Sequence, residues 1–195
     1  TQQKDIEEQK GLVKGRVIMT VVFTRCTTKN ELQQILDLQK MNLGANVKLE
    51  EKEQEGFVTV SHSLELLSEM NAVFPPIVAK DGNRVVGYAL CMHPSFKDDI
   101  EILKPMFLEI SAIVPHIDSY MIMGQICIAR EYRKQGIFRK LYEHMGHAVL
   151  PEFKGIITEV DAANQRSLQA HYAMGFTELK TYVSGGQEWK LIVLK

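Results

Sequence analysis

The chain has 195 residues, of which 45% are hydrophobic and 24% are charged, and its formal net charge at pH 7 is −1. A chain of this length can bury a hydrophobic core in one domain without the help of disulfide bonds or structural metal ions. The near-zero charge argues against a general nucleic-acid-binding protein, because such proteins usually carry a basic excess.

The cysteines and the N-terminal segment indicate in which cellular compartment the protein is expected. Cys26, Cys91 and Cys127 form no Cys-x-x-Cys pair, a usage typical of reduced thiols rather than of a disulfide framework. Residues 1–15 resemble neither a signal peptide nor a transit peptide. No apolar run reaches the roughly 20 residues of a membrane-spanning helix. We therefore expect a soluble, cytoplasmic protein that does not act in a membrane.

The first elements follow a polar N-terminus. Residues 1–15 are expected to form a flexible arm. The segment "RVIMTVVFTR" (16–25) is rich in β-branched residues and predicts a strand. Thr28 and Glu31 have the Thr-x-x-Glu spacing of a capping box, and leucine and isoleucine then recur at helical spacing, which predicts a helix over 29–43.

The middle of the chain is punctuated by turn residues. Ser63 is a candidate cap for a short helix. The segment "IVAKDGNRVVGYAL" (77–90) predicts a β-hairpin around Asp-Gly-Asn. Residues 93–118 contain three prolines, and a helix within 97–113 is expected to break or begin at Pro105.

The last third alternates strands and helices. The almost wholly apolar run 120–129 predicts a central strand covered on both faces. A helix over 136–150, a strand over 155–160 and a short helix over 165–174 follow. The strand–helix–strand order implies a parallel pair of strands joined by a crossover helix. Residues 176–195 predict a second hairpin around Ser-Gly-Gly.

These elements predict an α+β fold with a mixed sheet. We expect one domain over 16–195, with residues 93–118 as an insertion before the fourth strand. Long ordered insertions are frequently functional. The exposed edge of the C-terminal hairpin offers a surface for a homodimer.

A basic turn joins the central strand to the helix that follows it. Its residues are Arg133, Lys134, Gln135, Gly136, Ile137 and Phe138. At a helix start, unpaired backbone N–H groups and the helix dipole favour an anion. The turn is therefore a candidate phosphate site, although basic side chains at a helix start can also be merely solvated.

Two stretches carry a resemblance to a known family. "ICIAREYRKQGIFRKLYEH", followed by "EVDAANQRSLQAHYAMGF", resembles the acetyl-CoA-binding core of the GCN5-related N-acetyltransferases (GNAT). The pyrophosphate turn of that family reads Arg/Gln-x-x-Gly-x-Gly/Ala, which Arg133 and Gly136 match, whereas Phe138 replaces the small third residue. Asn164 and, eleven and twelve residues later, Gly175-Phe176 match the second signature of the family.

The resemblance implies a GNAT fold and acetyl-CoA as co-substrate, without a metal ion. The pantetheine arm of acetyl-CoA is expected to pair with the strand backbone like an added strand, and the diphosphate to lie on the turn. The implied acetyl-CoA-binding residues are Ile126, Cys127, Ile128, Arg133, Lys134, Gln135, Gly136, Ile137, Phe138, Asn164 and Ser167. The ring of Phe138 either turns away from the ligand or narrows the site.

The resemblance also suggests catalytic residues. An aliphatic amine is mostly protonated at neutral pH, so acetyl transfer needs a base. Glu159 occupies a position where some members carry that base, although an acid at a strand end is often only solvated. His171 replaces a Tyr that protonates the leaving thiolate in many members, and Tyr172 is the alternative; both residues could instead pack their helix. A backbone N–H near Ile128 is expected to polarise the thioester.

Two other features give weaker hypotheses. His144 and His147 share a helix face but lack a third metal ligand at useful spacing. Cys127 is expected to be a small apolar residue rather than a nucleophile.

Two function classes remain open. The first is an N-acetyltransferase that acts on a primary amine of a small molecule or a peptide. The second is a catalytically silent acetyl-CoA-binding or interaction module. The insertion 93–118 either walls the acceptor side, with acids that attract a cationic amine, or only covers the sheet. Binding of nucleic acid is excluded by the charge and by the lack of aromatic residues among the basic ones.

Overall fold

The computed structural model describes residues 21–47, 58, 60–113 and 119–195. The expected arm over 1–15 and the start of the first predicted strand lie outside these residues. The described strands are β1 (Val21–Arg25), β2 (Ile77–Asp81), β3 (Arg84–Met92), β4 (Met121–Ile128), β5 (Ile156–Asp161), β6 (Thr177–Ser184) and β7 (Gln187–Leu194). The described α-helices are α1 (Lys29–Asn42), α3 (Leu64–Val73), α4 (Lys104–Ile113), α5 (Ile137–Val149) and α6 (Gln165–Tyr172).

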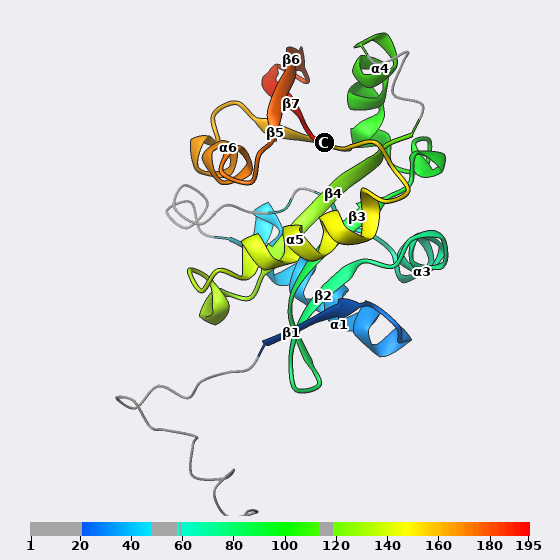
Figure 1. Ribbon diagram of the computed structural model, residues 1–195, viewed down its shortest axis with the longest axis vertical. Helices are drawn as coiled ribbons and strands as arrows, with labels where there is room; N and C mark the ends of the chain where they lie inside the picture. The colour runs from blue at the N-terminus through cyan, green and yellow to red at the C-terminus, as the bar shows by residue number, and fades with distance from the viewer. Residues whose placement is uncertain (1–20, 48–57, 59, 114–118) are drawn as a thin grey trace, which may run out of the picture.

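The strands form one mixed sheet in the order β1-β2-β3-β4-β5-β7-β6 (Figure 1). β4 and β5 are parallel, and every other neighbouring pair is antiparallel. The parallel pair is joined by α5, as the strand–helix–strand order requires. The predicted mixed α+β sheet, with hairpins on both sides of one parallel pair, is confirmed.

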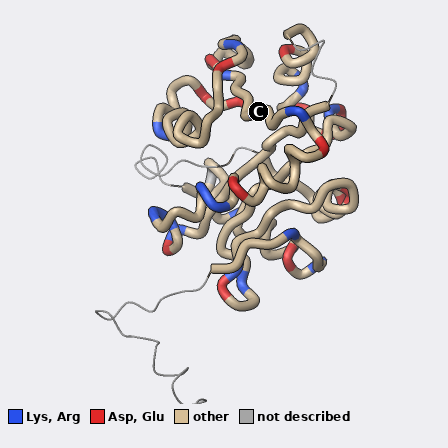
Figure 2. The backbone as a smooth tube through the Cα atoms, in the orientation of Figure 1, with Lys and Arg blue, Asp and Glu red and all other residues tan. Residues whose placement is uncertain are grey.

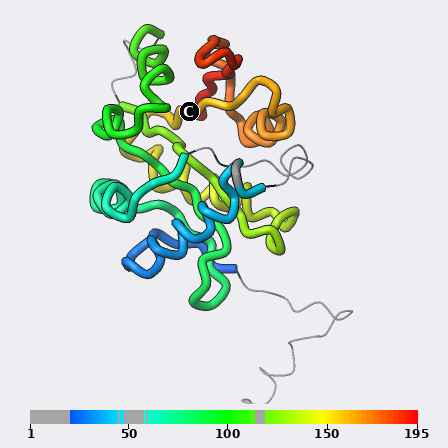
Figure 3. Tube along the Cα trace, turned by 180° about the vertical axis from the view of Figure 1, so that it is seen from behind, coloured from blue at the N-terminus to red at the C-terminus, as the bar shows by residue number. Residues whose placement is uncertain are grey.

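Helices cover both faces of the sheet. α5 lies over one face, where the ring of His144 stacks on Phe23 of β1 with centroids 5.3 Å apart. α1 and α3 lie on the opposite face, which Figure 3 shows from behind. Gln39 of α1 donates a hydrogen bond to Gln125 of β4 from that side. None of the described helices combines the length and the apolar character that a bilayer crossing requires.

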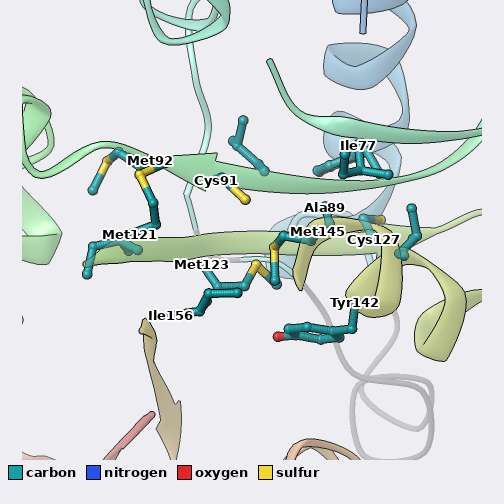
Figure 4. Close-up of a cluster of buried hydrophobic side chains, with 14 of the residues drawn as sticks. Ile77, Ala89, Cys91, Met92, Met121, Met123, Cys127, Tyr142, Met145 and Ile156 are labelled. Atoms are coloured by element: carbon teal, nitrogen blue, oxygen red, sulfur yellow. The ribbon is translucent and has the colours of Figure 1, made fainter. Parts of the chain in front are cut away.

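The largest part of the core lies between α5 and the central strands. Ile137, Leu141, Met145 and Val149 are all buried on one stripe of α5, which confirms the helical spacing read from the sequence. Met145 lies against Met123 and Ile156 (Figure 4). β4 is apolar on both faces because both faces are covered.

The parallel pairing of β4 and β5 is short. Only Met121↔Ile156 and Ile122↔Ile157 are paired. One residue further, the hydroxyl of Thr158 donates to the carbonyl of Met123 (2.9 Å), and this bond is the last one that joins the two strands among the described residues. Beyond it the strands diverge, and the β5-facing edge of β4 is left without a strand partner.

A β-bulge in β4 changes which residues face that open edge. Gly124 is the extra residue, since Met123 pairs with Cys91 and Gln125 with Leu90. Before the bulge, Met121 N–H bonds across to the start of β5. After it, Ala129 N–H bonds back to Val86 at the β3 side. Because backbone groups alternate in direction along a strand, the N–H groups of Ile126 and Ile128 point into the gap.

The insertion before β4 contains α4, which begins at Lys104 with Pro105 as its second residue. Proline is tolerated in the first turn of a helix, where its missing N–H has no partner to lose. The predicted start of a helix at Pro105 is therefore right to within one residue. Residues 114–118 of the insertion lie outside the described residues.

The capping box of α1 is formed as predicted. Glu31 also accepts hydrogen bonds from Thr27 N–H (2.8 Å), Thr28 N–H (3.1 Å) and Lys80 Nζ (2.6 Å). Burial by itself raises the pKa of Glu31, but the bonds from Lys80 and the two amides outweigh it and lower the pKa to about 2. The carboxylate thereby ties the start of α1 to β2.

We expect Glu31→Gln to lower the free energy of unfolding at pH 7 by roughly 3 kcal/mol, because a group whose pKa falls from 4.5 to about 2 stabilises the fold by that amount when it is ionised. This contribution is complete above pH 5 and is lost as the pH falls toward 2. Urea titrations between pH 7 and pH 3.5 should therefore show the difference between variant and wild type shrinking toward low pH. Asp37→Asn, at an exposed position of the same helix, should change stability by much less. A difference that stays constant with pH would contradict the ionic origin.

Candidate functional site

A cavity of about 350 Å³ opens beside the unpaired edge of β4. The residues that line it are Asn42, Val58, Ile126, Cys127, Ile128, Arg133, Lys134, Gly136, Ile137, Phe138, Asn164, Arg166, Ser167 and Ala170. Every residue predicted to bind acetyl-CoA is in this lining except Gln135, whose exposed amide donates to the carbonyl of Glu131 (2.9 Å). Asn42, Val58, Arg166 and Ala170 are additions that the sequence patterns did not indicate. We call this space the first cavity.

The start of α5 forms one end of the first cavity. Gly136 has a φ of 78°, and Lys134 before it has a φ of 61°, so the turn is tight and left-handed at both positions. The amides of Ile137 and Phe138 make no hydrogen bond with the described residues, as is usual in a first helical turn. Figure 2 shows basic positions both in this turn and at the start of α6. The end is therefore suited to an anion.

The side chain of Arg133 reaches two parts of the protein. Its Nε donates to the carbonyl of Ile128 (3.1 Å), and its Nη2 donates to Oδ1 of Asn42 at the end of α1 (2.6 Å). It thus joins the turn, the end of β4 and α1. The sequence predicts Arg133 as a ligand of the anion, and this role stays a prediction. In the structure its side chain fixes one wall of the first cavity.

Phe138 lines the first cavity and also belongs to a buried aromatic cluster. Its ring lies 5.0 Å from the ring of Tyr142 and 5.6 Å from that of His171. Phe176 packs edge-on against both Tyr142 and His171. The large ring at this position is accommodated because it packs toward α6, and the amide at the helix start keeps no partner from the described residues.

His171 is buried in the same cluster and does not line the described cavities. Its Nδ1 lies 2.7 Å from the carbonyl of Ser167, which can only accept, so Nδ1 carries the proton. Its Nε2 lies 2.7 Å from the hydroxyl of Tyr142 and therefore accepts from it. Burial lowers the pKa of His171, although the bond to Ser167 opposes this. The ring is therefore neutral at pH 7, and both nitrogens are engaged.

Tyr172, the alternative to His171, is half-buried and packs against the core. It is absent from the linings of the described cavities, and its hydroxyl makes no hydrogen bond with the described residues. The structure thus brings neither of the two predicted acids to the cavity surface. Their catalytic roles stay predictions.

A second, smaller cavity of about 70 Å³ lies further back along β4. It is lined by Val60, Ile102, Leu103, Met106, Ile122, Met123, Gly124, Thr158, Glu159 and Trp189. The two cavities share no residue: the first takes Ile126 to Ile128 from β4, and the second takes Ile122 to Gly124. They therefore follow each other along one strand on either side of Gln125.

Glu159 is the one titratable side chain in the lining of the second cavity. Its Oε2 accepts a hydrogen bond from the hydroxyl of Tyr182 on β6. Its Oε1 makes no hydrogen bond with the described residues. Burial raises the pKa of Glu159, and the bond from Tyr182 partly offsets the rise. A carboxylate with one free oxygen and a raised pKa has the properties of a general base.

A buried polar network lies behind the bulge, and the sequence patterns did not reveal it. Gln125 Oε1 accepts from Gln39 Nε2 (2.8 Å) and from the hydroxyl of Tyr88. Gln125 Nε2 donates to the carbonyl of Val60 (2.9 Å), and Gln39 Nε2 also lies 2.9 Å from Nδ1 of His62. The network fixes residues 60–62 beside β4, where Val60 lines the second cavity. The one sequence signal that could have indicated this network is the presence of single polar residues, such as Gln39 and Gln125, within apolar segments.

The structure also bears on the two weaker hypotheses. Among the described residues, no group of three or more His, Cys, Asp or Glu side chains could hold a metal ion. Cys127 lines the first cavity, but burial raises the pKa of its thiol to about 12, so the thiol stays protonated and is a poor nucleophile.

We expect Tyr142→Phe to destabilise the fold by about 1–3 kcal/mol, because it leaves Nε2 of His171 buried without a donor. Tyr172→Phe is the matched control, since it removes a hydroxyl that has no partner among the described residues, and should cost less than about 0.5 kcal/mol. Chemical denaturation measures both. In ¹⁵N NMR spectra, His171 should show the Nδ1–H tautomer at pH 7. Equal stability of the two variants, or an Nε2–H tautomer, would contradict the assigned bond.

The chain was compared with known families and structures. The family model described as the acetyltransferase (GNAT) family matches residues 45–176. No curated protein sequence matches the chain.

Solved structures of the same fold are numerous. NAA60 from Arabidopsis thaliana in complex with acetyl-CoA is 14% identical, with a TM-score of 0.63 over 90% of this chain and 99% of that one. The ribosomal-protein-S18-alanine N-acetyltransferase from Escherichia coli is 11% identical, with a TM-score of 0.60 over 90% and 93%. A chain of the NatC complex bound to Gag peptide and CoA is 17% identical, with a TM-score of 0.60 over 90% and 98%. At these identities the likeness concerns the fold.

Proposed function

We propose, on the premise that the chain belongs to the acetyltransferase (GNAT) family, that it transfers the acetyl group of acetyl-CoA to a primary amine of a small molecule or a peptide. One observation carries the proposal. A cavity suited to a diphosphate and an extended thiol arm adjoins, along β4, a cavity that holds a carboxylate with a raised pKa. In this proposal acetyl-CoA binds in the first cavity, and the amine loses its proton in the neighbouring second cavity.

The residues of the first cavity fit coenzyme A. The amides at the start of α5 and the side chain of Lys134 would hold the diphosphate, since hydrogen bonds to charged groups contribute about 1.5–3 kcal/mol each and the dipole about 0.3–1 kcal/mol. Arg166, across the cavity on α6, adds a second cation. The N–H and C=O groups of Ile126 that point into the gap would pair with the amides of the pantetheine arm.

The bound co-substrate supplies an acetyl thioester. The bulge at Gly124 turns the following amides of β4 toward the gap, so an N–H of Ile126 or Ile128 is placed to donate to the thioester carbonyl. A fixed backbone donor stabilises the negative charge that develops on that oxygen. The amide predicted from the sequence, near Ile128, belongs to this pair.

Glu159 would take the proton from the acceptor amine. Glu159 lines the second cavity, Tyr182 donates to its Oε2, and its Oε1 makes no hydrogen bond with the described residues. The base works in its ionised form, so activity should rise with pH through the raised pKa of Glu159. Titration of the amine itself, which must lose its proton, adds to the same rise.

The leaving thiolate does not require the side chain of His171. A thiol has a pKa near 8.5, so the thiolate is a stable leaving group near neutral pH and takes its proton from water. For His171 to donate, its bond from Tyr142 would first have to break. In our proposal His171 therefore supports the wall formed by Phe138, and it does not touch the sulfur.

We expect Glu159→Gln to lower kcat by roughly 10²–10⁴-fold, the usual effect of losing a general base, and to leave acetyl-CoA binding intact because Glu159 lies outside the first cavity. Acceptor-dependent thiol release measures the first effect, and calorimetric titration with acetyl-CoA the second. Glu188→Gln, an exposed acid on β7, is the control and should change neither.

Two results would overturn parts of this account. If the folded protein binds no acetyl-CoA at millimolar concentration, the proposed function is wrong. If it binds acetyl-CoA but releases no thiol with a panel of amines, the silent acetyl-CoA-binding module is the better description.

Tyr182→Phe should move the low-pH limb of kcat to higher pH. Tyr182 donates to the carboxylate and so lowers the pKa of Glu159; without this bond the pKa rises and the base is ionised only at higher pH. The Km for acetyl-CoA should not change, because Tyr182 does not line the first cavity. A pH profile of kcat for both proteins tests this. A limb that stays in place would exclude Glu159 as the titrating base.

A further inference from the structure

The second cavity is apolar apart from its base. Of its lining residues, only Glu159 carries a charge, and only Thr158 adds a side-chain hydroxyl. That hydroxyl is already used, since it donates to the carbonyl of Met123. The remaining side chains are aliphatic, thioether or aromatic, and come from four separate parts of the chain. A ligand here meets one carboxylate and otherwise hydrocarbon.

The insertion supplies one wall of this cavity with its apolar residues. Ile102, Leu103 and Met106 line it, and in Figure 1 α4 lies at the same end of the sheet as β5, β6 and β7. The acids of the insertion do not line the cavity. Their positions are as follows: Asp98 and Asp99 are exposed, Glu101 is paired with Lys104, and Glu109 is paired with Lys180 of β6 (2.6 Å).

The pairing of two of these four acids weakens one sequence hypothesis. The sequence suggested that acids on the insertion attract a cationic amine. Because Glu101 and Glu109 are each neutralised by a lysine, they add little net field at the cavity. A second positive charge on the acceptor would have to enter a wall that offers it no charged partner among the described residues, which is strongly unfavourable.

The walls that the described residues form leave apolar side chains partly exposed. Ile102 is 57% exposed although it lines the cavity, and Trp189 and Val60 are half-buried in the same lining. Space of roughly 10–15 Å³ holds one water molecule, so about 70 Å³ holds a chain of about five to seven heavy atoms. An alkyl group of that size would cover these side chains.

We infer that the second cavity takes the alkyl group of the acceptor, and that the substrate class is a primary amine whose attached group is apolar, uncharged and about five to seven heavy atoms long. The inference rests on the proposed function, because Glu159 must meet the amine in the same cavity. The acyl chain of the thioester is the other hydrocarbon that could enter. The acceptor is favoured because the base and the apolar walls share one cavity.

Two amines of nearly equal length separate the alternatives. Pentylamine ends in a methyl group, whereas butane-1,4-diamine ends in a second ammonium group. We expect kcat/Km for pentylamine with acetyl-CoA to exceed that for the diamine by roughly 100-fold, the discrimination available to an apolar pocket. Equal or better use of the diamine would overturn the inference.

Binding is read independently of turnover through Trp189, which is the single tryptophan of the chain and lines the second cavity. With CoA present, pentylamine should change Trp189 fluorescence at a concentration roughly 10- to 100-fold lower than the diamine. If pentylamine binds selectively but no thiol is released, the proposed function fails and only the assignment of the second cavity to an alkyl amine stands. If neither amine changes the fluorescence, the inference is wrong.

A matched pair of variants tests the location. Ile102→Asp places a carboxylate on the cavity wall, and Leu108→Asp makes the same change at a 73% exposed position of α4 outside the lining. Both positions are exposed enough for the variants to fold. Ile102→Asp should lower pentylamine selectivity at least about tenfold, and Leu108→Asp should leave it unchanged. Equal effects of the two variants would overturn the inference.

The length of the acyl chain gives a further test. Faster turnover of butyryl-CoA than of acetyl-CoA, without any preference for pentylamine, would also overturn the inference, since this result would assign the second cavity to the acyl chain.

Discussion

The organisation of this protein depends on the point at which β4 and β5 stop pairing. Two residue pairs hold the strands together, and the hydroxyl of Thr158 makes the last bond across them, to Met123. Past that bond the edge of β4 has backbone groups without a strand partner. Buried backbone groups need partners, so an unpaired edge in the middle of a sheet is a site for an extended ligand. The first cavity lies at this edge.

The same region shows why backbone groups can keep a function while side chains change. The anion end of the first cavity is built from amides at the start of α5, and the side chain of Phe138 packs away into an aromatic cluster with Tyr142 and His171. A large residue replaces a small one there without removing the donor. Likewise, the hydroxyl group next to His171 belongs to Tyr142 of α5, and it donates a hydrogen bond to the imidazole. In our proposal the chemistry therefore depends on the backbone of β4 and on Glu159.

Buried polar groups in this fold are almost all paired, and the pairs connect distant segments. Arg133 reaches Asn42 across 91 positions of the chain, and Gln125 reaches Gln39 across 86. These bonds hold α1 and residues 60–62 against β4, where they complete the walls of both cavities. Among the described residues, Oδ1 of Asn71 is the one buried side-chain oxygen or nitrogen without a partner. A fully paired network fixes a single arrangement of the walls, because any shift would leave a buried group unsatisfied.

The sequence by itself determined the local elements and the turn that precedes α5. Helix periodicity, the capping box at Thr28 and the apolar run before Arg133 depend on residues close together in the chain, so the bounds of α1, α5 and β4 were predicted to within one or two residues. Tertiary structure alone decided the rest. It placed Glu159 in a different cavity from the turn, buried His171 among aromatic rings, and engaged Arg133 with α1. These outcomes depend on contacts between segments far apart in the chain, and no local pattern specifies which distant partner a polar side chain will meet.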